Sequence, residues 1–366
     1  MAEQGAHNFS RRLMLKGILA TALALSEWGC SLPGSNPTTT TRKPVAARPP
    51  GSRLYTYHGH TSRVTSVGWS PDGKYIASGS LDKTIQIWNS TTGARMLTYK
   101  GHASEVTTLA WSADSRQIAS SALNKQVQVW QALSGRLQTI YHGHSDQVTQ
   151  LSWFPGGDLI ASGSWDTTVQ IWSPRDGSRH LTYRGHSAPV NSISLSSDGR
   201  YIASGAQDKT VQVWDSGSGK QLFTYHGHSK EVTAVSWSPD GKYIASGSLD
   251  KTVHVWEATT GRELYTYSGY NLKAATVDPS KGVLPDIILA VAWSDNGKRI
   301  AALTQEYCGD ECGVVLLWDA LTGRNIAFFS ELPIFALAWS PDSTRIVTAT
   351  STSLVDSTSV VEIHST

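Results

Sequence analysis

The stretch YHGHTSRVTSVGWSPDGKYIASGSLDKTIQIW, residues 57–88, carries the pattern that decides the fold. Its opening Tyr-x-Gly-His returns at Tyr99, Tyr141, Tyr183 and Tyr225, a constant step of 42 residues. Its closing tryptophan keeps the same step. A fixed period of this length indicates a repeat architecture, in which neighbouring units bury one continuous core between them.

Each unit predicts four short strands separated by turns. Residues 64–69 alternate apolar and polar side chains, as a strand with one buried face does. The Ser-Pro-Asp-Gly sequence at 70–73 is a turn signal, because glycine accepts a positive φ. Residues 75–78, 84–88 and 95–99 supply the other three strands. Four strands every ~40 residues, starting at Gly-His and ending near Trp, predict the blade of a β-propeller.

On these motifs the chain resembles the WD40-repeat family over residues 53–366, although only Trp214 and Trp318 precede the literal Asp of a Trp-Asp pair. Residues 54–57 form a fourth strand without a blade, and the last blade lacks a fourth strand. We therefore expect an all-β, seven-bladed propeller of four-stranded antiparallel blades, closed by the N-terminal strand pairing with residues 360–364. The seven expected ends of third strands are Trp88, Trp130, Trp172, Trp214, Trp256, Trp318 and, in a degenerate copy, His364.

Five repeats place His, Ser, an acid or its amide, and Trp at a fixed spacing. A catalytic triad needs one exposed nucleophile beside an oxyanion site, and repeated identical copies do not fit that need. The sets resemble the family's buried tetrad, in which Asp accepts from His, His contacts Ser, and Ser contacts the Trp indole. The second blade has Asn instead of Asp, which can still accept a bond, without the charge. The expected structural tetrads are His60, Ser78, Asp82, Trp88; His102, Ser120, Asn124, Trp130; His144, Ser162, Asp166, Trp172; His186, Ser204, Asp208, Trp214; and His228, Ser246, Asp250, Trp256.

Composition argues against several other classes of protein. The 31 Lys and Arg against 29 Asp and Glu give a net charge of +2, without the basic stripe of a nucleic-acid protein. No phosphate-binding loop, acid–base carboxylate pair or metal-ligand cluster stands outside the repeat. His58, His142 and His226 precede Gly-His motifs two blades apart, so we expect solvated loop residues there. We expect no catalytic residues, no cofactor and no metal.

The first thirty residues are typical of an export signal. Residues 10–16, with their two arginines, resemble a twin-arginine signal and precede the apolar run 17–25, about half of what a membrane span needs. Gly29-Cys30 resembles a bacterial lipoprotein signal, which implies lipidation at Cys30. Glu27 stands where that signal has an aliphatic residue, so an uncleaved anchor or a chance match is the alternative.

The cysteines and the next segment complete the expected organisation. Residues 31–52, rich in Ser, Thr and Pro, predict an extended tether. Cys308 and Cys312 would form a disulfide in an exported chain, and two unpaired surface thiols are the alternative. The expected division is a signal over 1–30, a tether over 31–52 and a propeller over 53–366. The expected location is outside the cytoplasm at a bacterial membrane, with the cytoplasm as the alternative.

Three insertions are predicted on one face of the ring. The link at about 270–286 is 14 residues longer than in earlier blades, and the second-to-third-strand loops at 304–313 and 350–359 are each six residues longer. In an antiparallel four-stranded blade these segments share a face, and long loops on a rigid scaffold often bind partners. Tolerated drift in degenerate blades is the alternative.

The family resemblance implies that side chains on this face touch a partner. The related positions lie three and five residues after the Gly-His histidine, and just before the tetrad Asp. Trp165 stands out, because near-identical blades have Leu81 and Leu249 there; it is a candidate hot spot, or it packs on its own blade. The expected partner-binding residues are Arg63, Leu81, Glu105, Leu123, Gln147, Trp165, Gln207, Glu231 and Leu249, with Pro189 and the second set Thr65, Thr107, Thr149, Asn191 and Thr233.

We therefore expect a non-catalytic, monomeric scaffold that binds a protein or peptide, binds no nucleic acid, and meets the membrane only through its tether. A small-ligand or glycan-binding propeller that uses the same face is the second possibility. A propeller enzyme, such as a quinone-dependent dehydrogenase, is the third, and the repeats lack the acidic cluster that its calcium ligands would need.

Overall fold

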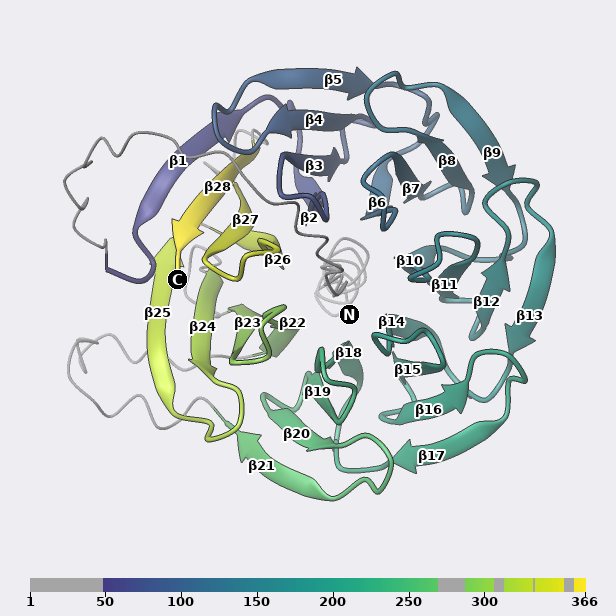
Figure 1. Ribbon diagram of the computed structural model, residues 1–366. Coiled ribbons are helices and arrows are strands. Elements are labelled where there is room, and N and C mark those ends of the chain that lie inside the picture. Colours follow the sequence, from purple (N-terminus) through teal and green to yellow (C-terminus); the bar gives the residue numbers. More distant parts are fainter. Residues whose placement is uncertain (1–48, 269–286, 306–312, 332, 352–358) are drawn as a thin grey trace, which may run out of the picture.

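Seven four-stranded antiparallel sheets surround a common axis as the blades of a propeller (Figure 1). The computed structural model describes residues 49–268, 287–305, 313–331, 333–351 and 359–366. These described residues contain β-strands and no helix. The first strand of each blade lies nearest the axis and the fourth lies on the circumference. The predicted seven-bladed propeller is confirmed.

The strands of the first four blades have nearly equal lengths. Their bounds are β2 (Val64–Trp69), β3 (Tyr75–Ser80), β4 (Ile85–Asn89) and β5 (Arg95–Tyr99) in blade 1; β6 (Val106–Trp111), β7 (Gln117–Ala122), β8 (Val127–Gln131) and β9 (Leu137–Tyr141) in blade 2; β10 (Val148–Trp153), β11 (Ile160–Ser164), β12 (Val169–Trp172) and β13 (Arg179–Tyr183) in blade 3; and β14 (Val190–Leu195), β15 (Tyr201–Ala206), β16 (Val211–Asp215) and β17 (Gln221–Tyr225) in blade 4.

Blade 5 keeps the strand lengths of blade 1, and blades 6 and 7 contain longer strands, of up to seven residues. Their bounds are β18 (Val232–Trp237), β19 (Tyr243–Ser248), β20 (Val253–Glu257) and β21 (Glu263–Tyr267) in blade 5; β22 (Ile287–Trp293), β23 (Arg299–Gln305), β24 (Gly313–Asp319) and β25 (Asn325–Glu331) in blade 6; and β26 (Ile334–Trp339), β27 (Arg345–Ser351), β28 (Ser359–Ser365) and β1 (Arg53–His58) in blade 7.

Local sequence explains the turns that join these strands. Ser70 closes the first turn of blade 1: its carbonyl accepts from Gly73 N at 2.8 Å and its hydroxyl lies 2.6 Å from Asp72 Oδ1. Gly73 has φ of +69°, a conformation that side chains disfavour. The Gly-His motif needs its glycine for a different reason, which is lack of space. A Cβ on Gly59 would lie 2.4 Å from Gln86 Oε1.

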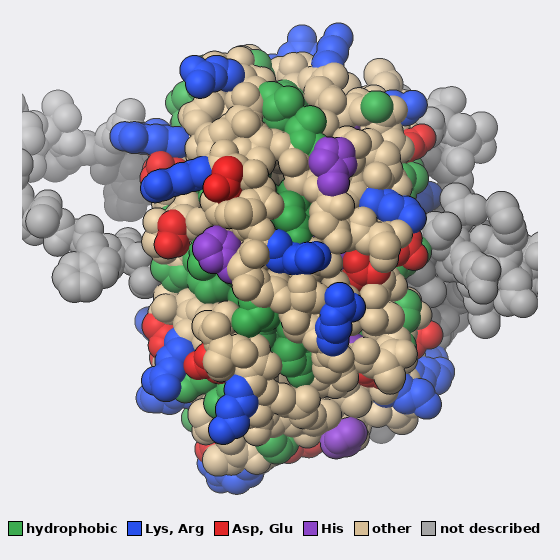
Figure 2. Space-filling view, turned by 90° about the vertical axis from the view of Figure 1, so that its right-hand side faces the viewer, with side chains coloured by type: hydrophobic (Ala, Val, Ile, Leu, Met, Phe, Trp, Pro, Cys, Tyr) green, Lys and Arg blue, Asp and Glu red, His purple; other side chains and the backbone are tan. Residues whose placement is uncertain are grey.

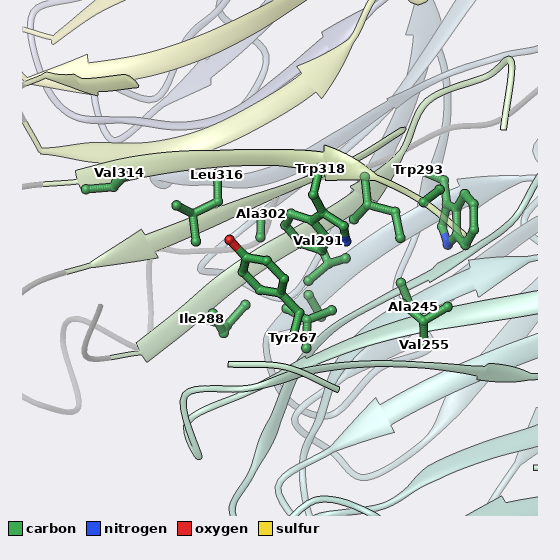
Figure 3. Close-up of a cluster of buried hydrophobic side chains, with 14 residues drawn as sticks. Ala245, Val255, Tyr267, Ile288, Val291, Trp293, Ala302, Val314, Leu316 and Trp318 are labelled. Carbon is green, nitrogen blue, oxygen red and sulfur yellow. The ribbon is translucent and has the colours of Figure 1, made fainter. Parts of the chain in front are cut away.

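The hydrophobic core lies between the blades. Figure 3 shows this at one boundary, where Tyr267 of blade 5 packs on Trp318 and Ile288 of blade 6. The rings of Tyr267 and Trp318 stack with centroids 4.3 Å apart. The same stack joins the fourth strand of one blade to the third strand of the next at Tyr99 and Trp130, with centroids 4.1 Å apart. Each blade therefore packs its apolar side chains against those of its neighbours, as repeat architectures require.

The ring closes as predicted. Strand β1 pairs antiparallel with β28, with Tyr57 opposite Val361 and His58 opposite Val360. Gly51 N donates to Ser365 O at 2.7 Å, and Ser365 N donates to Ser52 O at 3.0 Å. The seventh blade thus combines one strand that starts the described chain with three that end it.

Candidate functional site

The structure brings the predicted tetrads together in blades 3, 4 and 5, and in blade 1 it brings together His60, Ser78 and Asp82. In each, the His Nδ1 lies 2.7–3.0 Å from the Asp carboxylate and the His Nε2 lies 2.7–2.8 Å from the Ser hydroxyl. In blades 3, 4 and 5 the Trp indole N–H also donates to this hydroxyl, at 3.0–3.2 Å. These bonds tie the link before each blade to its second and third strands.

The tetrad carboxylates are held in their charged form. Burial alone would raise the pKa of Asp82, but hydrogen bonds from His60 and Thr84, with the charge of His60, outweigh it and lower the pKa to about 2. The same balance lowers the pKa of Asp208 to about 2, and it lowers the pKa of Asp166 and of Asp250. Each tetrad therefore contains a hydrogen-bonded carboxylate at neutral pH.

Blade 2 departs from this pattern, and here the sequence-based expectation was wrong. His102 keeps its contact with Ser120, at 2.7 Å, but Asn124 does not accept from it. Among the described residues, the buried His102 Nδ1 has no hydrogen-bond partner. The other blades hold their Asp with a threonine hydroxyl two residues later, as Thr84 does at 2.6 Å, and blade 2 has Gln126 instead. Burial lowers the pKa of His102 to about 4.

The tetrads cannot supply a catalytic nucleophile in this conformation. Ser78, Ser120, Ser162, Ser204 and Ser246 are all fully buried. A nucleophile must reach its substrate beside an oxyanion site, and no substrate can reach these hydroxyls. What the tetrads do is fix the shape of the loops above them.

Those loops form one surface, which we call the link face. It consists of the inter-blade links, such as residues 59–63, and the second-to-third-strand turns, such as residues 81–84. A backbone bond joins the two in every one of blades 1 to 5. Leu81 donates to Arg63 O at 2.9 Å in blade 1. The equivalent pairs are Leu123 with Glu105, Trp165 with Gln147, Gln207 with Pro189 and Leu249 with Glu231, at 2.9–3.0 Å. The structure thus brings two of the three predicted contact sets together, pair by pair.

Exposure separates these residues. Leu123 is exposed, whereas Leu81, Trp165, Gln207 and Leu249 are partly buried. The indole N–H of Trp165 lies in the buried part of that side chain. Arg63, Glu105 and Glu231 are also partly exposed. Gln147 is different, because it is only 6% exposed, so its side chain offers little surface to a partner.

The second predicted set does not face a partner. These five side chains are buried, and each donates to a backbone carbonyl of the next blade: Thr65 to Val106 O, Thr107 to Val148 O, Thr149 to Val190 O, Asn191 to Val232 O and Thr233 to Ile288 O, at 2.7–3.1 Å. First strands crowd together around the axis, so a short polar side chain there meets the neighbouring blade before it meets solvent. These five residues therefore hydrogen-bond adjacent blades to each other.

The side of the outer wall that Figure 2 shows has no dominant charge. In Figure 2 basic, acidic and hydrophobic side chains are interspersed on the side of the ring that faces the viewer. A protein that binds nucleic acid would concentrate basic residues in a stripe. The face in view shows no such concentration.

Several expectations fall outside the described residues. The signal and the tether to residue 48, with Cys30, lie there, as do Cys308, Cys312 and most of the three predicted insertions. Within the described residues no helix is long and apolar enough to cross a membrane.

Sequence reasoning missed two residues of blade 5. His254 stands where blades 1 to 4 have Gln86, Gln128, Gln170 and Gln212, and it lies beside the tetrad of its blade. Glu263 stands where those blades have Arg95, Leu137, Arg179 and Gln221. The available signal was their departure from the repeat, which a search for shared positions passes over.

Comparison with known proteins finds the same repeat. The family model described as WD domain, G-beta repeat matches more than half of the chain, at residues 51–89, 93–131, 135–173, 177–215 and 219–257. Each matched segment holds the fourth strand of one blade and three strands of the next.

Short stretches are similar to three larger proteins. Protein HIRA of Zea mays is 56% identical over 36 residues, the BOP1 ribosome biogenesis protein homolog of Monosiga brevicollis 43% over 51, and the Notchless protein homolog of Arabidopsis thaliana 44% over 50. These stretches are 10–14% of this chain and 4–10% of the relatives' own length.

Proposed function

Because the chain belongs to the WD domain, G-beta repeat family, we propose that it is an interaction scaffold that binds a protein or peptide partner on its link face. The observation that supports this most is the ring made by Leu81, Leu123, Trp165, Gln207 and Leu249, one from each of five blades. Each of these residues is fixed by a backbone bond to the adjoining link. A fixed rim with apolar side chains at four of these five positions binds without a large ordering penalty, because the scaffold is rigid.

The chemistry around this ring indicates the kind of partner. Two positions after each ring residue, the backbone is left-handed without glycine: φ is +69° at Lys83, +71° at Lys125, +71° at Thr167, +70° at Lys209 and +76° at Lys251. Such conformations are uncommon for residues other than glycine and are frequent at functional sites. Lys83, Lys125 and Lys209 are exposed. We propose a partner with an apolar anchor for the ring and acidic residues for the lysines.

Trp165 provides the test. A partner captured from membrane extract is purified and titrated against the wild type and Trp165→Ala, and we expect affinity to fall by at least ~2 kcal/mol, about 30-fold, if Trp165 is the hot spot. Trp165→Leu, which installs the residue of blades 1 and 5, keeps part of the affinity. Leu133→Ala, at a side chain 52% exposed on the third-to-fourth-strand turn of the opposite face, changes nothing. Wild-type affinity in Trp165→Ala contradicts the proposal, and binding that survives proteolysis of all extract proteins favours the small-ligand or glycan alternative.

We also propose that the scaffold is exported and tethered through Cys30. The twin arginines, the short apolar run and Gly29-Cys30 support this, since together they have the layout of an export signal with a lipidation site. We expect the wild type in the membrane fraction and Cys30→Ala in the soluble extracytoplasmic fraction. Equal partition of both forms contradicts lipidation at Cys30.

A further inference from the structure

The two departures from the repeat in blade 5 meet in space. His254 is only 8% exposed, and its Nδ1 lies 3.2 Å from Glu263 Oε2. Tyr225 Oη lies 2.6 Å from the same nitrogen and 3.0 Å from Glu263 Oε2. Blades 1 to 4 have no histidine and no carboxylate at these two positions.

This pair adjoins a complete tetrad. The rings of His254 and His228 have centroids 4.3 Å apart, and His228 Nδ1 lies 3.0 Å from Asp250 Oδ2. One ligand atom from each of His228, Asp250 and His254 lies within 4.8 Å of the other two. In the described part of the chain, this is the one such group of three.

We infer that blade 5 holds a binding site for a divalent transition metal, best suited to zinc, with His228, Asp250 and His254 as ligands. Two imidazoles and a carboxylate form a donor set that zinc prefers, and three protein ligands leave a fourth position for water. Zinc bonds of about 2.1 Å place tetrahedral ligand atoms about 3.4 Å apart. The histidine–carboxylate separation already permits this, and a shift of at most about 1.4 Å by the His254 ring completes the set.

The hydrogen-bond partners of the two histidine ligands also suit a metal site. A ligating histidine usually donates its other N–H to a carboxylate or another fixed acceptor. Glu263 is that carboxylate for His254. Ser246, 2.8 Å from His228 Nε2, is the acceptor for His228, because a hydroxyl oxygen can accept from this N–H and from Trp256 together. Asp250 and Glu263 supply two negative charges beside two neutral imidazoles, which balances a divalent cation.

Titration of chelator-treated full-length protein with ZnCl₂ tests the site. We expect one zinc per chain at this site and, with CoCl₂, the visible absorption of tetrahedral cobalt. His254→Gln installs the residue of blades 1 to 4, so the blade keeps its native alternative, and it should abolish this stoichiometric binding. Glu263→Gln should weaken zinc binding 10- to 100-fold, the usual effect of losing a partner behind a ligand.

Blade 4 offers a matched gain of function. It has the tetrad of His186 and Asp208 but Gln212 and Gln221 at the two departing positions. Gln212→His with Gln221→Glu should raise the stoichiometry to two zinc ions per chain, whereas Gln212→His alone should bind the second ion more weakly. Every variant keeps the three cysteines, so they cannot cause a difference. Zinc binding that is absent in the wild type, or unchanged in His254→Gln, overturns the inference.

Discussion

Asn124 differs from Asp82, Asp166, Asp208 and Asp250 only by an amide in place of a carboxylate oxygen, yet it leaves a buried histidine nitrogen unsatisfied. A buried polar atom without a partner destabilises a fold by its full desolvation penalty. We expect Asn124→Asp to raise the free energy of unfolding by about 1–2 kcal/mol, because the new carboxylate accepts from His102. Urea unfolding measures this. Adding Gln126→Thr should give a further gain, and an unchanged or lower midpoint in Asn124→Asp contradicts the assignment.

The tetrad aspartates also make stability depend on pH in a defined direction. The pKa of Asp82 is lowered from 3.8 to about 2 on folding. A group with a depressed folded-state pKa contributes stability that is present above its unfolded pKa and is lost as the pH falls through the folded value. We expect Asp82→Asn to destabilise the protein at pH 7. We expect the difference in unfolding free energy between this variant and the wild type to narrow between about pH 4 and pH 2. Urea midpoints of both proteins across this range check it, and a gap independent of pH would refute it.

At the scale of the element, each outer strand fastens its blade to the next. Tyr141, at the end of β9, stacks on Trp172 of blade 3 with centroids 4.3 Å apart and donates to Gln170 at 2.5 Å. We expect Tyr141→Phe to destabilise the protein by about 1–2 kcal/mol, because it keeps the stack and leaves Gln170 unsatisfied. Tyr141→Ala should destabilise it by about 3–5 kcal/mol, because it also opens a cavity. Equal effects of the two substitutions would show that the stack contributes little.

The sequence predicted the strands and turns better than it predicted the contacts between them. Turn signals and the 42-residue step predicted four strands per blade, because those depend on local chemistry. The period could not show that Tyr141 stacks on the following blade, since it fixes position along the chain and not the neighbour in space. It also could not show that Thr65 is buried at 0% exposure, because that follows from the crowding of first strands around the axis. The tetrad with Asn124 failed for a similar reason, because the spacing predicts which residue stands at a position and not which atoms pair in space.

At the scale of the molecule, the degenerate seventh blade fills the positions of the repeat with different residues that still pair with one another. His364 occupies the tryptophan position and is buried, with Nε2 3.1 Å from Thr348 Oγ1, which stands at the serine position. Glu362, also buried, stands where blade 1 has Gln86 and pairs with Arg53 of β1 at 2.9 Å. The closing blade therefore depends on contacts between the two ends of the described chain.

Deletion of residues 51–58 tests that dependence. The truncation removes β1, so β28 becomes an open edge, Arg53 no longer faces the buried Glu362, and Trp88 loses its stack on Tyr57, whose centroid lies 4.8 Å away. Exposed strand edges promote aggregation, and loss of a partner from a buried charge destabilises strongly. We expect the truncated protein to aggregate or to lose its cooperative melting transition. A matched deletion of residues 1–48 retains every described contact of β1, so we expect its melting curve to equal that of the full chain. A melting curve unchanged by removal of 51–58 would show that the ring does not need its N-terminal strand.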